Sequence, residues 1–129
     1  MKKLYTRTIL TILSFFFALA VNAQALEDVT NGIRSGNETL VAKYFDNTVA
    51  ITINNNQSLY SKAQAEIVLK DFFSKNQVKD FTVKQGGPSG DNAKYAVGAL
   101  TTSNGTYQLY LVLRLKDNSY VLREIRLEK

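Results

Sequence analysis

The chain has 129 residues, with 16 Lys or Arg against 11 Asp or Glu, a net charge of +5, and neither Cys nor His. Without Cys it can form no disulfide, and without either residue type zinc and iron lose their usual ligands. The same absence excludes every catalytic arrangement that is built on a Cys or His side chain. We therefore expect no metal site and no cofactor.

The N-terminal residues 1–23 have the pattern of a secretory signal peptide. A basic start precedes the apolar run Ile9–Val21. That run has roughly 13 residues, whereas a helix needs ~20 to span a bilayer. The small residues of Val21-Asn22-Ala23 predict cleavage after Ala23, with cleavage after Ala25 as the alternative. We therefore expect an exported protein, periplasmic or secreted, that keeps no stable membrane anchor.

Removal of this leader changes the charge balance of the chain. Three of the 16 basic residues lie in it, so residues 24–129 carry 13 basic and 11 acidic residues, a net charge of +2. These charges are scattered and form no basic patch, so we expect no nucleic-acid partner. The remaining length fits a single domain.

Two short helices and a strand pair are predicted at the start of this domain. Leu26, Val29 and Ile33 recur at helical spacing. Gly36 readily adopts the left-handed backbone conformation that often follows the last residue of a helix. Asn37 suits the N-cap of a second helix over residues 37–45. From residue 48 the apolar period changes to two, which predicts a strand, a turn at residues 54–56 and a short partner strand. The apolar face of the second helix comprises Leu40, Val41, Tyr44 and Phe45.

The stretch YSKAQAEIVLKDFF, residues 60–73, predicts a long helix. Ser61 and Gln64 form a capping-box pattern at its start. Ile67 points away from the apolar face, so we expect it to contact something outside the core. The pattern is typical of a helix laid on a sheet. The apolar face comprises Ala65, Val68, Leu69, Phe72 and Phe73.

Four antiparallel strands are predicted in the remainder of the chain. KDFTVKQ is the first, and GGPSGDN is a loop. KYAVGALTTS and TYQLYLVLRL flank Asn104-Gly105, a strong hairpin signal, and Asp117-Asn118 turns the chain into SYVLREIRL. The predicted fold class is α+β: a curved antiparallel sheet, with an N-terminal helix pair and one long helix packed on one face.

Pairing of the last three strands across two-residue turns sorts their side chains onto two faces. The face expected under the helices comprises Ala96, Gly98, Leu100, Tyr107, Leu109, Leu111, Leu113, Leu115, Tyr120 and Leu122, with Glu124 and Arg126 at its end. On the other, outer face, Tyr and Arg interleave with aliphatic residues, as in protein–protein interfaces. The interface candidates on it are Tyr95, Val97, Tyr110, Val112, Arg114, Arg123 and Ile125.

The order of elements resembles the nuclear-transport-factor-2-like superfamily, whose members form a cone. Within that superfamily SGNETLVAKYFDNTVAITI, YSKAQAEIVLKDFF, YAVGALTTSNGTYQLY and LREIRLE are similar to a family of secreted Bacteroidetes proteins, a domain of unknown function. The resemblance covers nearly all of residues 24–129. It implies a cone-shaped domain and export, a pocket between the long helix and the sheet, and dimerisation through the outer sheet face.

Two functions are compatible with these patterns. The leading hypothesis is a non-catalytic exported module that forms a homodimer, or binds a partner, through the outer sheet face. The alternative is a binder of a small apolar or amphipathic molecule, or an isomerase-like or dehydratase-like enzyme, that uses the cone pocket; no complete catalytic set is present. Glu124 and Arg126 would either orient the polar end of a ligand or form a structural ion pair. The other pocket candidates, whose hydroxyls line the pocket or lie at its rim, are Tyr44, Tyr60, Tyr107 and Tyr120.

Overall fold

The N-terminal part of the domain is helical. The structure is a computed structural model that describes residues 24–129; the predicted leader and its cleavage after Ala23 lie outside the described residues. A helix over residues 24–34 comes first, and the turn after it contains Gly36, which has a φ of +62°. The elements after it are α2 (Glu38–Ala42), β1 (Phe45–Ile53), β2 (Asn56–Ser61), α3 (Lys62–Lys75), β3 (Val78–Pro88), β4 (Ala93–Thr102), β5 (Gly105–Lys116) and β6 (Ser119–Glu128).

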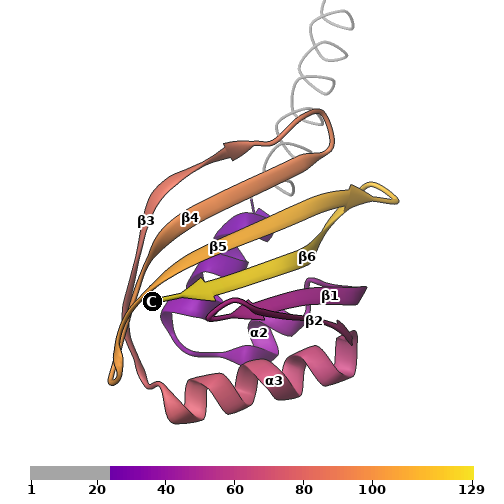
Figure 1. Cartoon of the computed structure of the whole chain (residues 1–129). Coiled ribbons are helices and arrows are strands. Elements are labelled where there is room, and N and C mark those ends of the chain that lie inside the picture. Colours follow the sequence, from indigo (N-terminus) through magenta and orange to yellow (C-terminus); the bar gives the residue numbers. More distant parts are fainter. Residues whose placement is uncertain (1–23) are drawn as a thin grey trace, which may run out of the picture.

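The six strands form one curved sheet in the order β2-β1-β6-β5-β4-β3. Every neighbouring pair is antiparallel except β1 and β6, which are parallel. The sheet curves around the helices, and α3 runs along its β1–β2 side (Figure 1). The predicted α+β architecture is therefore confirmed.

Helix α3 has the cap and the faces that its sequence predicts. The Ser61 side chain accepts a hydrogen bond from the Gln64 backbone N–H at 3.3 Å. Ile67 is 66% exposed, as expected for a residue that points away from the core. The residues that α3 buries are Ala65, Leu69, Phe72 and Phe73. Within residues 24–129, no helix combines the length and the apolar character that crossing a membrane requires.

The second helix is shorter than its pattern predicts. Asn37 caps it as expected, accepting from the Leu40 N–H at 3.1 Å, but α2 ends at Ala42. Phe45 already lies in β1, where it pairs with Leu122 of β6 and is 4% exposed. Tertiary strand pairing therefore overrides the local helical spacing of Tyr44 and Phe45.

Strand β3 is longer than its pattern predicts, because it continues through the Gly-Gly-Pro segment that we expected to be a loop. Gly86 and Gly87 pair with Ala96 and Tyr95 of β4. A side chain at position 86 would approach the Tyr95 carbonyl oxygen at 3.1 Å. Glycine therefore permits close pairing at this edge of the sheet.

Two of the three predicted hairpin turns are where the sequence places them. Asn54 and Asn55 both have positive φ, as do Asp117 and Asn118, which matches type I′ turns. The β4–β5 turn is shifted by one residue from the predicted position. Thr102 and Gly105 form its last pair, so the turn consists of residues 103 and 104, and Gly105 has a φ of +106°.

Candidate functional site

A β-bulge at Arg123 decides which side chains of β6 reach the outer face. Val112 of β5 pairs with Glu124, but the next residue, Leu113, pairs with Leu122, so Arg123 is an extra residue in β6. Beyond such a bulge the alternation of side chains between the two faces is inverted. Strand β6 therefore exposes a different set of residues from the one that strict alternation predicts.

The bulge overturns the predicted positions of three candidate residues. Ile125 is fully buried in the core, so it is not an interface residue, and Leu127 is buried beside it. Glu124 and Arg126 lie on the outer face and not under the helices, where we expected them. The sequence carries a signal for this feature, because two successive charged residues, Arg123 and Glu124, interrupt the apolar alternation of β6.

Glu124 and Arg126 form an ion pair that is open to solvent. Nη2 of Arg126 donates a hydrogen bond to Oε1 of Glu124 at 3.0 Å. The Arg126 side chain is 46% exposed and the Glu124 side chain is 26% exposed. Of the two alternatives, this geometry matches the structural ion pair, although on the opposite face from the predicted one. Such exposed pairs contribute about 0–1 kcal/mol to stability.

Tyr44 has a structural contact with the first helix. Its hydroxyl donates to Asp28 Oδ2 at 2.5 Å. This hydrogen bond, together with partial burial and the charge of Asp28, raises the pKa of Tyr44 from 10.0 to about 12. The contact ties the segment after α2 to the helix over residues 24–34.

Tyr107 joins the end of α3 to the sheet. Its hydroxyl donates to Asn76 Oδ1 at 3.2 Å, and its ring packs edge-on against Phe72 with 5.1 Å between centroids. Asn76 also donates to the Phe72 carbonyl and accepts from Asn104 in the β4–β5 turn. Buried polar groups are normally satisfied in this way.

The remaining pocket candidates, Tyr60 and Tyr120, are half-buried and pack against the core. The Lys94 ammonium lies 4.6 Å from the centroid of the Tyr120 ring. The hydroxyl groups of the four candidate tyrosines share no hydrogen-bond partner among the described residues. The structure therefore does not bring them together as one hydrogen-bonding wall.

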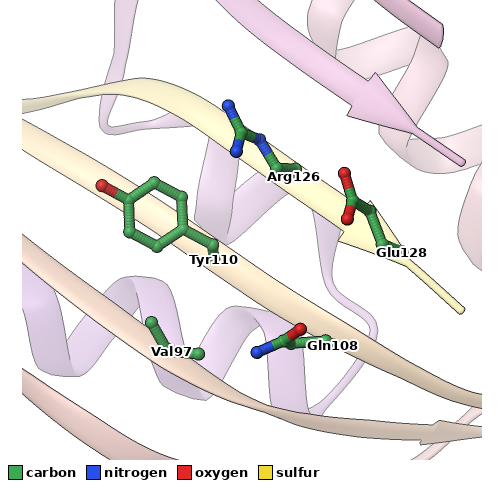
Figure 2. Close-up of a pocket in the computed structure, with 5 residues that line it drawn as sticks. All are labelled: Val97, Gln108, Tyr110, Arg126 and Glu128. Carbon is green, nitrogen blue, oxygen red and sulfur yellow. The ribbon is translucent and has the colours of Figure 1, made fainter. Parts of the chain in front are cut away.

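The outer face of β4, β5 and β6 carries an aromatic surface that we call the tyrosine patch: Tyr95, Val97, Gln108 and Tyr110, with Arg126 and Glu128 at its edge. Figure 2 shows five of these side chains on three neighbouring strands. The Tyr95 and Tyr110 rings are 6.4 Å apart, and the Arg126 guanidinium is 5.8 Å from the Tyr110 centroid. Together Val97, Gln108, Tyr110, Arg126 and Glu128 line a shallow recess of about 200 Å³.

A second cluster of charges lies where β1, β5 and β6 meet. Asp46 accepts from Lys116 Nζ at 2.8 Å, and Arg123 Nε is 3.6 Å from its other oxygen. The hydrogen bond from Lys116 holds the pKa of Asp46 below its usual range, against the opposing effect of burial. The cluster fixes the end of the β5–β6 hairpin to the start of β1. In the part of the chain that the structure describes, no group of three or more potential metal ligands is present.

This fold and its open outer sheet face define a nuclear-transport-factor-2-like domain. The family model "Domain of unknown function (DUF4783)" matches residues 26–128, and the chain belongs to this family. The predicted relationship to Bacteroidetes proteins of unknown function is therefore confirmed. No curated protein matches the chain.

Solved structures agree with this assignment. A DUF4783 family protein from Bacteroides uniformis has 31% identity and a TM-score of 0.77, covering 80% of this chain and 94% of that one. A second family member, from Bacteroides ovatus, has 26% identity and a TM-score of 0.77, covering 79% and 92%. An NTF2-like protein of unknown function from Shewanella oneidensis has 15% identity and a TM-score of 0.61, covering 83% and 95%, and shows the fold alone.

Proposed function

We propose that this protein is an exported, non-catalytic module that self-associates through the tyrosine patch. The observation that carries the proposal is the composition of the patch, where Tyr and Arg side chains contact one another on an uncovered sheet face. Tyr and Arg are enriched in protein interfaces and at their energetic hot spots. Of the predicted interface residues, Tyr95, Val97 and Tyr110 form its centre.

The charges on this face support a second copy of the chain as the partner. The edge of the patch carries both signs, with Arg126 and Glu128 on the same strand. In a two-fold arrangement each surface meets its own copy, so a basic side chain of one protomer can lie opposite an acidic one of the other. The other predicted interface residues on this face, Val112, Arg114 and Arg123, lie outside the tyrosine patch and are not needed for this self-association, and Ile125 is buried.

Export is supported by the N-terminal pattern, and the position of Ala25 favours cleavage after Ala23 over cleavage after Ala25. Ala25 is 6% exposed and belongs to the core, so cleavage after Ala23 keeps this contact in the mature chain, whereas cleavage after Ala25 removes it. Expression with the native leader, followed by N-terminal sequencing of the exported protein, should give Gln24 as the first residue.

Self-association is tested by Tyr110→Glu. The new carboxylate lies beside Arg126, so the fold should survive, but two such charges facing each other in a dimer should repel. Sedimentation velocity should show a dimer for the parent chain and a monomer for the variant. Ile67→Glu is the matched control, because it places the same charge at an exposed apolar position of α3 and should stay dimeric. A dimeric Tyr110→Glu variant would exclude the tyrosine patch as the interface.

A further inference from the structure

A second recess on the outer face adjoins the tyrosine patch, and we call it the arginine groove. It encloses about 510 Å³, within the range of small-molecule sites. It shares no residue with the tyrosine patch. The groove is lined by Thr48, Ala50, Leu59, Val112, Arg114, Arg123 and Glu124.

Three residues of the groove are apolar, and Glu124 lies between two of them, since it pairs with both Ala50 and Val112. Ala50 and Val112 are half-buried in the groove, and Leu59 of the edge strand β2 pairs directly with Ala50. Leu59 is nevertheless 71% exposed, the largest exposed fraction of any large apolar side chain within residues 24–129. Covering these groups removes apolar surface from water, which favours binding of an apolar chain or ring.

The groove also carries positive charge, on Arg114 and Arg123, that the nearby carboxylates do not fully neutralise. Arg114 forms no ion pair within the described part of the chain. Arg123 is 3.6 Å from Asp46, but the shorter contact of Asp46, at 2.8 Å, is with Lys116. Glu124 lines the groove as well, but it accepts from Arg126, outside the groove, at 3.0 Å.

The β-bulge explains why Glu124 lies in the same groove as the two arginines, which strict alternation already places on the outer face. Because Arg123 is the extra residue of β6, the next residue, Glu124, lies on the same outer face. The parallel partner β1 is irregular at the same place, since Phe45 pairs with Leu122 but the next pair is Ala50 with Glu124. Bulges commonly re-aim a side chain in this way beside binding sites.

We propose that the arginine groove binds a small anionic amphiphile. The guanidinium groups of Arg114 and Arg123 bind its charged head, since their planar N–H donors match a carboxylate or a phosphate. Its apolar chain covers Ala50, Val112 and Leu59. This site differs from the pocket between the long helix and the sheet that the resemblance implies, and its ligand binding is independent of self-association.

The test uses octanoate as the probe and isothermal titration calorimetry on the mature protein. Octanoate should bind more tightly than butyrate, which has the same head and a shorter chain, and more tightly than octanol, which has no charge. Arg114→Gln and Arg123→Gln should each weaken octanoate binding about tenfold, the loss expected for a charge-assisted hydrogen bond. Leu59→Ser should weaken it severalfold and leave butyrate unaffected.

Controls separate this site from general charge effects and from the proposed dimer. Lys70→Gln removes one positive charge from the exposed side of α3 and should leave octanoate affinity unchanged. Tyr110→Glu should bind octanoate like the parent, whereas Arg114→Gln should keep the parent's oligomeric state. Octyl phosphate identifies the head: tighter binding than octanoate indicates a phosphate amphiphile, and weaker binding a carboxylic acid.

Three results would overturn the proposal. The first is that octanoate does not bind, and the second is that both arginine variants bind it like the parent. The third is that inorganic phosphate or butyrate binds as tightly as octanoate, which would mean that the groove binds anions non-specifically and does not recognise an apolar chain. Of the five substituted side chains, Arg114, Arg123, Leu59 and Lys70 are exposed and Tyr110 is half-buried, so circular dichroism should confirm that the variants are folded.

Discussion

At the scale of single residues, side-chain hydrogen bonds fix the ends of the elements to one another. Tyr44 reaches Asp28 in the first helix, and Asn76 connects the end of α3 with Tyr107 and with the β4–β5 turn. Asp46 binds Lys116 at the far end of the β5–β6 hairpin. Two of the predicted pocket residues, Tyr44 and Tyr107, thus have contacts that stabilise the fold.

The Tyr44 contact predicts a loss of stability at high pH. The pKa of Tyr44 in the folded protein, about 12, lies above its ordinary value of 10.0, so the folded state binds the proton more tightly than the unfolded state. The stabilisation is therefore fully present below pH 10 and is lost as the pH rises through about 12. Urea denaturation should show that the parent chain loses more unfolding free energy across this window than Tyr44→Phe does. Equal losses in the two proteins would contradict this assignment.

At the scale of elements, the bulge in β6 determines the outer face. Without it, Glu124 and Arg126 would lie against the helices, and Ile125 and Leu127 would be exposed. The bulge inverts this arrangement and completes the core with the two aliphatic side chains. The same feature brings Glu124 into the arginine groove beside Arg123.

Two alanine substitutions in β6 test the inverted alternation. Ile125→Ala should lower the free energy of unfolding by about 2–5 kcal/mol, because it leaves a cavity in the core. Arg126→Ala, one residue further on, should change it by less than about 1 kcal/mol, because its ion pair is open to solvent. Chemical denaturation measures both values. The reverse order would mean that β6 continues in strict alternation.

The contact between β3 and β4 depends on a glycine. A Cβ atom at Gly98 would lie 2.4 Å from the Thr82 carbonyl oxygen and 2.7 Å from the Phe81 ring, and Phe81 is buried. Gly98→Ala should therefore destabilise the domain by about 1–3 kcal/mol, the range for overpacked cores. Its thermal midpoint should fall well below that of Ala99→Ser, the neighbouring outer-face control. An unchanged midpoint for Gly98→Ala would contradict this close approach.

At the scale of the whole molecule, the two sheet faces have different roles. The helices and the inner face form one core, while the outer face of β1, β4, β5 and β6 remains open and carries both the tyrosine patch and the arginine groove. We therefore propose that the outer face carries the function of this protein, with self-association at one region and ligand binding at the other.

The sequence predicts the architecture well because its strongest signals are local. The cap and apolar face of α3 and the Asn-rich and Asp-Asn turns depend on residues that are close in the chain. The same alternation correctly assigns both faces of β4 and most of β5. It fails beyond Arg123, from Glu124 onward, because a bulge depends on how β6 fits β5 and β1. The arginine groove could not be predicted from the sequence for a related reason, because the parallel β1–β6 pairing joins segments that are far apart in the chain.

The central claim, that the outer sheet face is a self-association surface, is tested most directly by native mass spectrometry of the mature protein over a range of concentrations. We predict a mass of twice the mature chain that grows with concentration, and only the single-chain mass for Tyr110→Glu. A parent protein that remains a single chain at every concentration would contradict the claim.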